Sequence, residues 1–85
     1  MFEYNDVLTR EYKNAEIEIV VEDDAITMGR VYLDKRCVDV REFTTEDGGD
    51  VAFNRANFDN VLDQLKGIVD VMWEENAKKL TAVAR

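Results

Sequence analysis

The feature that most constrains this chain is a long segment of helical periodicity that begins after Asn54. No proline interrupts residues 55–80, and Gly67 is the one residue there that strongly disfavours a helix. Apolar side chains recur at the three- and four-residue spacing of an amphipathic helix, and Asn54 is a favourable N-cap. The sequence therefore predicts one helix from residue 55 to about residue 80.

The predicted helix is too long for one small domain to cover. About 26 helical residues span roughly 39 Å, whereas a compact chain of 85 residues is on the order of 30 Å across. Burial of each large apolar side chain is worth about 1.5–3 kcal/mol, so we expect a second copy to cover the far end in a two-fold homodimer. The alternative is a helix that bends or ends near Gly67 and folds back on its own sheet. The predicted dimer interface consists of Leu65, Ile68, Val69, Met72, Trp73 and Leu80.

The segment before the helix changes to a period of two, which is typical of half-buried strands. We predict an antiparallel meander of four strands over residues 15–21, 25–33, 37–43 and 50–53, joined by turn-forming polar segments. In the third strand Val38 and Val40 are expected to face inward, with Asp39 and Arg41 outward. Residues 5–13 are interpreted as a short helix or an irregular arm.

These elements predict a single α+β domain over residues 1–85, with a four-stranded antiparallel meander followed by a long C-terminal helix (ββββα), as a dimer. Within it we assign residues 1–14 to the arm or short helix, 15–53 to the sheet, and 54–85 to the helix and tail.

Composition argues against catalysis and against a cofactor. The chain has no histidine, no serine and a single cysteine, so neither a His/Cys zinc site nor an internal disulfide is available, and the usual general base is missing. Three acids at residues 22–24 resemble a solvated turn more than a metal site. We expect no enzyme activity, no cofactor and no metal.

The sequence also predicts a cytoplasmic protein. No stretch approaches the roughly 20 apolar residues of a membrane span, and the first ten residues lack the basic and apolar regions of a signal peptide.

The formal net charge of −8 is confined to the sheet half of the chain. Residues 54–85 contain five bases and five acids, whereas residues 1–53 contain six bases and fourteen acids, which leaves eight acids in excess. Such a surface repels bulk nucleic acid at long range. It either serves solubility alone or faces a basic partner.

Two segments resemble the C-terminal domain of the positive cofactor four family of transcriptional coactivators. They are VDVREF at residues 38–43 and VAFNRANFDNVLDQL at residues 51–65, in which Asn54 matches the helix-capping position and Phe58 the first core aromatic of the helix. The order of four strands and a long helix is also similar. The likeness covers roughly residues 15–70, but the basic hairpin of the family is replaced by the acidic TTEDGGD.

The resemblance implies a homodimer that binds single-stranded DNA across its curved sheets, in replication, recombination or transcription. Basic side chains contact phosphates and aromatic rings stack on bases in such complexes. The residues that it offers here for nucleic-acid binding are Arg30, Tyr32, Lys35, Arg36, Arg41 and Phe43.

The sequence is also compatible with two other functions. The acidic sheet half is also typical of a protein-binding module, such as a viral inhibitor or nucleic-acid mimic, that engages a basic surface on a nucleic-acid enzyme. Alternatively, the chain is a structural assembly factor whose only task is dimerisation through its helix. For each proposed binding residue, an ordinary structural role is the competing interpretation: Arg41 pairs with a neighbouring acid, and Tyr32 and Phe43 belong to the core.

Overall fold

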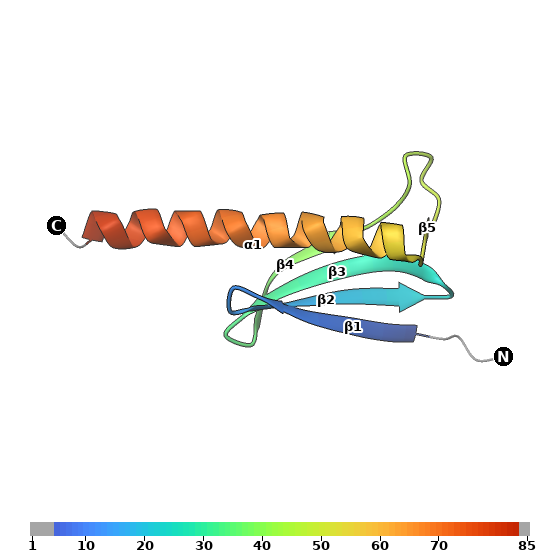
Figure 1. The fold of residues 1–85 in the computed structure, drawn as a ribbon, viewed down its shortest axis with the longest axis horizontal. Helices are drawn as coiled ribbons and strands as arrows, with labels where there is room; N and C mark the ends of the chain where they lie inside the picture. Colours follow the sequence, from blue (N-terminus) through green and yellow to red (C-terminus); the bar gives the residue numbers. More distant parts are fainter. Residues whose placement is uncertain (1–4, 84–85) are drawn as a thin grey trace.

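The computed structural model describes residues 5–83, with side chains described for residues 6–75. Four antiparallel strands form a meander in the order β1-β2-β3-β4, and one long helix follows (Figure 1). This confirms the predicted α+β fold. The elements are β1 (Asn5–Tyr12), β2 (Ala15–Glu22), β3 (Ala25–Leu33), β4 (Arg36–Glu42), β5 (Val51–Ala52) and α1 (Arg55–Val83).

The interpretation of residues 5–13 as a helix or an arm was wrong, because this segment is the first strand of the meander. All eight residues of β1 pair with β2, from Asn5 opposite Glu22 to Tyr12 opposite Ala15. Leu8 and Tyr12 alternate onto the face that carries the core and pack against it. The backbone pairing and the burial of these two side chains outweigh the weak helical spacing of the segment.

Three two-residue turns connect the four strands, and none of them contains glycine. The central residues are Lys13 and Asn14, Asp23 and Asp24, and Asp34 and Lys35, and each has a φ between 48° and 66°. Positive φ at both positions is what a type I′ hairpin turn requires. Asparagine and aspartate tolerate this left-handed region better than most residues.

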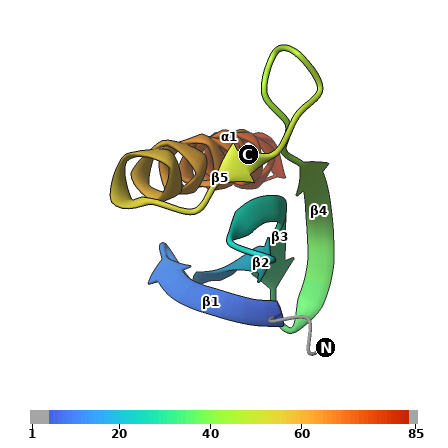
Figure 2. The same cartoon turned by 90° about the vertical axis from the view of Figure 1, so that its right-hand side faces the viewer.

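The predicted fourth strand is only the two-residue β5, which pairs with β3 along the same edge as β4. Between them the chain leaves the sheet as a loop over residues 44–50, closed by a hydrogen bond from Gly48 N to Thr45 O (2.9 Å). The β4 and β5 segments therefore form one edge of the sheet, interrupted by this loop (Figure 2).

The expected orientation of β4 is reversed in the structure. Val38 and Val40 are exposed at 42% and 49%, and Arg41 lies opposite Gly29 on the face toward the helix. The physical reason is a register shift of the kind seen at a β-bulge. Val31 pairs with Asp39 but Tyr32 pairs with Cys37, which leaves Val38 without a partner and reverses the alternation.

The core lies between one face of the sheet and α1. Ile17 and Ile19 from β2, Val31 from β3, and Leu65 and Val69 from α1 are fully buried. Gly29 marks the closest approach, because an added Cβ there falls 2.6 Å from Leu65 Cδ1 and 3.0 Å from Phe43 Cε2. Burial of this apolar set is the main source of stability in so small a domain.

The helix begins as predicted and does not break. Asn54 Oδ1 accepts a hydrogen bond from Asn57 N at 2.8 Å, which satisfies a free amide of the first turn. The helix then runs without interruption through Gly67 for 29 residues, or about 43 Å. It continues past the end of the sheet (Figure 1), so the alternative of a bent helix folded back on its sheet is excluded.

Substitution by alanine is expected to have opposite effects on fold stability at Gly29, inside β3, and at Gly67, inside α1. Gly29→Ala forces the buried Leu65 to shift in a closed core, and overpacking of this kind costs about 1–3 kcal/mol. Gly67→Ala meets no atom within 4 Å and removes a poor helix former, so it is neutral or stabilising by up to about 1 kcal/mol. Urea unfolding of both variants measures the free energy differences. Equal effects of the two substitutions would contradict the close packing at Gly29.

Candidate functional site

The face of the sheet that points away from α1, called here the outer face, is uncovered among the described residues. Val7, Val38 and Val40 on this face are exposed at 45%, 42% and 49%. Val20, opposite Val7 on the same face, is buried. Most exposed apolar residues occur singly and need no explanation, but several on one uncovered sheet face are typical of a contact surface.

Arg30 and Tyr32 lie on the outer face because they flank the fully buried Val31 in β3. The Nε atom of Arg30 is 3.5 Å from Glu18 Oε1, too loose for a good hydrogen bond, and it has no hydrogen-bond partner among the described residues. Tyr32 is half-buried and sits opposite Glu16 on β2. The guanidinium of Arg30 and the ring of Tyr32 are therefore both partly exposed and can contact a ligand.

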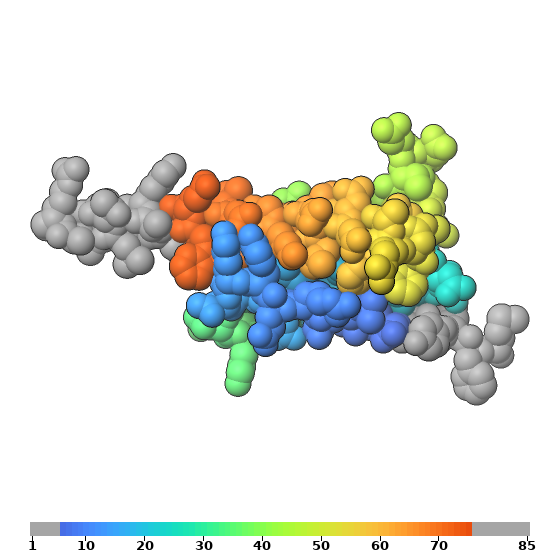
Figure 3. Space-filling view, in the orientation of Figure 1, coloured from blue at the N-terminus to red at the C-terminus, as the bar shows by residue number. Residues whose placement is uncertain are grey.

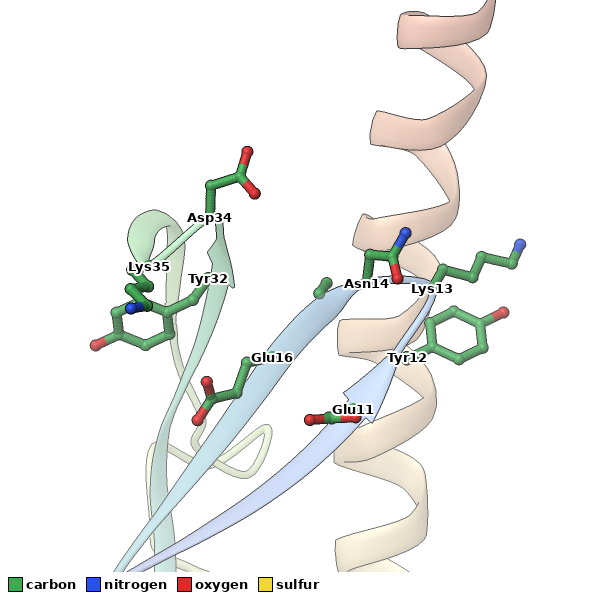
Figure 4. A pocket seen from close by; sticks show the side chains of 9 residues that line it. Glu11, Tyr12, Lys13, Asn14, Glu16, Tyr32, Asp34 and Lys35 are labelled. Atoms are coloured by element: carbon green, nitrogen blue, oxygen red, sulfur yellow. The ribbon is translucent and has the colours of Figure 1, made fainter.

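A polar cleft of about 600 Å³ lies where the first and third hairpin turns come together. Figure 4 shows Tyr32 and Lys35 on one side of the cleft and Tyr12 and Lys13 on the other, beside the helix. Arg36, which follows the third turn, is exposed. The cleft is lined by Glu11, Tyr12, Lys13, Asn14, Ala15, Glu16, Tyr32, Asp34 and Lys35.

The structure separates the six proposed nucleic-acid-binding residues. Arg30 and Tyr32 share the outer face, Lys35 lies in the third turn at the end of that face, and Arg36 lies opposite Leu33 on the helix side. Arg41 and Phe43 lie on the helix side of the sheet.

The last two have structural contacts of their own. Arg41 Nη2 is 3.5 Å from Asp39 Oδ2, and Phe43 packs against the core over Gly29. Both also line a cleft of about 400 Å³ between β4 and α1, together with Asn57, Asn60 and Gln64 of the helix, which have amide side chains.

The proposed dimer residues also fall into different groups. Leu65 and Val69 are fully buried against the sheet, so they belong to the core of one protomer, which corrects the expectation for these two. Ile68 and Met72 are partly exposed, and Trp73 is exposed at 43%. The side chain of Leu80 lies outside the described residues.

The sequence reasoning missed Val71, which at 54% is the most exposed large apolar residue of the helix in the described part of the chain. It follows Ile68 by three positions and Gly67 by four, and this spacing is the signal that could have identified it.

A polar cluster ties the first hairpin turn to the middle of the helix. Lys13 Nζ lies 2.6 Å from Asp70 Oδ1, and the Tyr12 hydroxyl donates to the same oxygen at 2.9 Å. Trp73 Nε1 donates to the Lys13 carbonyl at 2.7 Å, so the indole is held by its own protomer. The hydrogen bond from Lys13, followed by that from Tyr12, lowers the pKa of Asp70, and Asp70 raises the pKa of Lys13.

The charges of the outer face are mainly acidic. Alternation along the strands places five glutamates on the outer face, where they outnumber the basic side chains of Arg30 and Lys35. Arg30 is already opposed by Glu18, so any anionic ligand depends on close contacts rather than on long-range attraction. The five are Glu11, Glu16, Glu18, Glu22 and Glu42.

Neither a metal centre nor a membrane-spanning helix is found within the described range. Among residues 6–75 no group of three or more metal-binding side chains could hold an ion. No helix in the part of the chain that the structure describes is long and apolar enough to cross a membrane.

Comparison with known proteins gives no relative: no family model, no curated protein and no solved structure matches the chain.

The Asp70 contact is expected to be visible in its titration. Because the folded pKa of Asp70 lies below its ordinary value of 3.8, the contact stabilises the fold above about pH 4 and is lost as the pH falls through the folded pKa. Lys13→Ala removes the main cause and is expected to raise the pKa of Asp70. Carboxyl NMR titration measures this shift, and Lys35→Ala, the same change in the other turn, serves as the control. An Asp70 pKa that is equal in the wild type and Lys13→Ala would contradict the assignment.

Proposed function

We propose that the protein is a non-enzymatic single-stranded DNA-binding protein that acts as a homodimer in replication, recombination or transcription, in the cytoplasm. The observation that carries the proposal is the uncovered outer face, where the exposed Val40 lies opposite Arg30 and the exposed Val38 follows Cys37, the partner of Tyr32. The resemblance of residues 38–43 and 51–65 to the positive cofactor four family adds support, as does the observed order of strands and helix.

The binding chemistry follows from these side chains. A base stacks on Tyr32, and neighbouring bases lie against the exposed valines, with each aromatic stack worth about 1–3 kcal/mol. The partly exposed guanidinium of Arg30 contacts a phosphate or a base edge, and Lys35 and Arg36 contact phosphates at the turn end. Few phosphate contacts and many nearby glutamates give weak binding, and because the salt dependence scales with the number of phosphates contacted, it is shallow.

The homodimer is proposed from the part of α1 that overruns the sheet. Val71 and Trp73 are exposed at 54% and 43%, and Met72 is only partly covered. The hydrogen bond from Trp73 Nε1 to the Lys13 carbonyl places this segment where the helix passes the first hairpin turn, at the end of the sheet. Pairing of the helix around Val71 with the same segment of a second copy buries this side chain on both protomers, whereas Trp73 points about 200° away around the helix and stays bonded to its own protomer.

The acidic outer face supports a second candidate, a module that binds a basic surface on a nucleic-acid enzyme. In this function the glutamates of β1, β2 and β4 make the contact, together with three acids of the protruding loop. Those three are Glu46, Asp47 and Asp50.

Binding of labelled oligo-dT at low salt, followed by fluorescence anisotropy, tests the first candidate. We expect a dissociation constant of tens of micromolar or tighter. Tyr32→Ala is expected to weaken binding about tenfold through loss of one stack. Tyr32→Phe, the matched control, keeps the ring and retains most of the affinity. Absence of binding at tens of micromolar wild-type protein would overturn the DNA-binding proposal. The acidic protein-binding module would then be the remaining candidate function.

The dimer is tested by analytical ultracentrifugation at micromolar concentration. Val71→Glu places a charge in the proposed interface and is expected to convert a dimer into a monomer, because an unpaired charge is costly to bury. Val7→Glu makes the same change on the outer face and is expected to leave the dimer intact. A wild-type chain that sediments as a monomer would refute the dimer directly.

A further inference from the structure

A groove of about 560 Å³ runs between β1 and the first half of α1, on the side of the sheet opposite the outer face. Leu8, Phe58 and Leu62 supply its apolar lining, and the exposed Phe53 lies edge-on to Phe58, with ring centroids 6.3 Å apart. In Figure 3 the β1 strand runs along this side of the helix, so the groove is bounded by a strand below and a helix above.

The strand that borders this groove is also a free edge of the sheet. β1 is first in the strand order and pairs with β2 alone, so no described strand occupies its other side (Figure 2). Along such an edge every second residue turns its backbone N–H and C=O groups outward, although Val7 N already donates to Asp6 Oδ1 and the Thr9 carbonyl already accepts from Arg10. An extended peptide that pairs with an edge strand places every second side chain in the adjoining groove.

The rim of the groove is positive although the chain as a whole carries a charge of −8. Arg10 and Arg55 line it, and neither forms an ion pair within the described residues. Arg10 is held in place by the Phe58 ring, 5.2 Å below its guanidinium, and by the Thr9 carbonyl at 2.7 Å. Among the described residues of the lining Asp59 is the one carboxylate, so the two arginines leave a positive excess there.

We propose that this groove binds an acidic peptide in extended conformation, which adds to β1 as an additional strand. An apolar side chain of the peptide enters between Leu8, Phe58 and Leu62. Carboxylates on the same face of the peptide contact Arg10 and Arg55. The site uses neither the outer face nor the overrunning part of α1, so it is independent of the proposed function.

A designed peptide tests the proposal with the full-length ¹⁵N-labelled protein. In acetyl-Glu-Thr-Val-Thr-Phe-Thr-Glu-amide, glutamate, valine, phenylalanine and glutamate share one face of a strand. We expect it to shift the amide signals of β1 with a dissociation constant of about 1 mM or tighter. Two control peptides, one with lysine for both glutamates and one with proline for the central threonine, are expected to bind at least about tenfold more weakly, because each removes one element of the recognition.

Protein variants locate the site. Arg55→Ala removes a side chain that has no ion pair within the described residues, and it is expected to weaken peptide binding about fivefold without unfolding the chain. Lys35→Ala, the matched loss of one charge on the outer face, leaves peptide binding unchanged and weakens oligo-dT binding instead. These opposite responses keep a failure of this proposal distinguishable from a failure of DNA binding.

Several results would overturn the inference. One is an acidic peptide that does not bind at several millimolar, and another is a lysine peptide that binds equally well. If oligo-dT shifts the β1 signals and displaces the peptide, the groove is a nucleic-acid contact. If the peptide dissociates a dimer, the occupant of the β1 edge is a second copy of the chain.

Discussion

The contact of α1 with β3 at Gly29 is the packing interaction on which the rest of this structure depends. Because glycine leaves no side chain there, Leu65 reaches the sheet and closes the core with Ile17, Ile19 and Val31. This contact makes one face of the sheet dry and leaves the other in solvent. It also sets where the helix lies along the strands, and therefore how much of the helix extends past them. The outer face, the groove beside β1 and the extension of the helix past the sheet are all consequences of this placement.

Much of the fold could be predicted from local signals. The N-cap at Asn54 and the apolar spacing after it identified the helix, and the paired aspartates at residues 23–24 identified a turn. β1 escaped prediction because Val7 and Leu8 are adjacent, which suits a helix as well as a strand. Only the backbone pairing with β2 decides between these alternatives.

The candidate site was less predictable, because it depends on register rather than on residue type. Arg41 and Phe43 occur two residues apart and share a face, as the sequence requires. Which face they share depends on the shift at Val31 and Tyr32, and no local pattern reports it. Exposed Val38 and Val40 are the visible result. Likewise, the sequence predicts Trp73 as an interface residue. The structure shows that its indole also donates a hydrogen bond to the Lys13 carbonyl of its own protomer.

The hairpin turns hold two lysines of the polar cleft in an unfavourable backbone conformation. Lysine has a Cβ, and an ordinary side chain in the left-handed region costs about 1–2 kcal/mol relative to a helical or extended conformation. Lys13 and Lys35 both occupy that region, with φ of 48° and 66°, and both line the cleft. Glycine at either position would relax the backbone but remove an ammonium group. The fold thus holds its two cleft lysines in place against their own conformational preference.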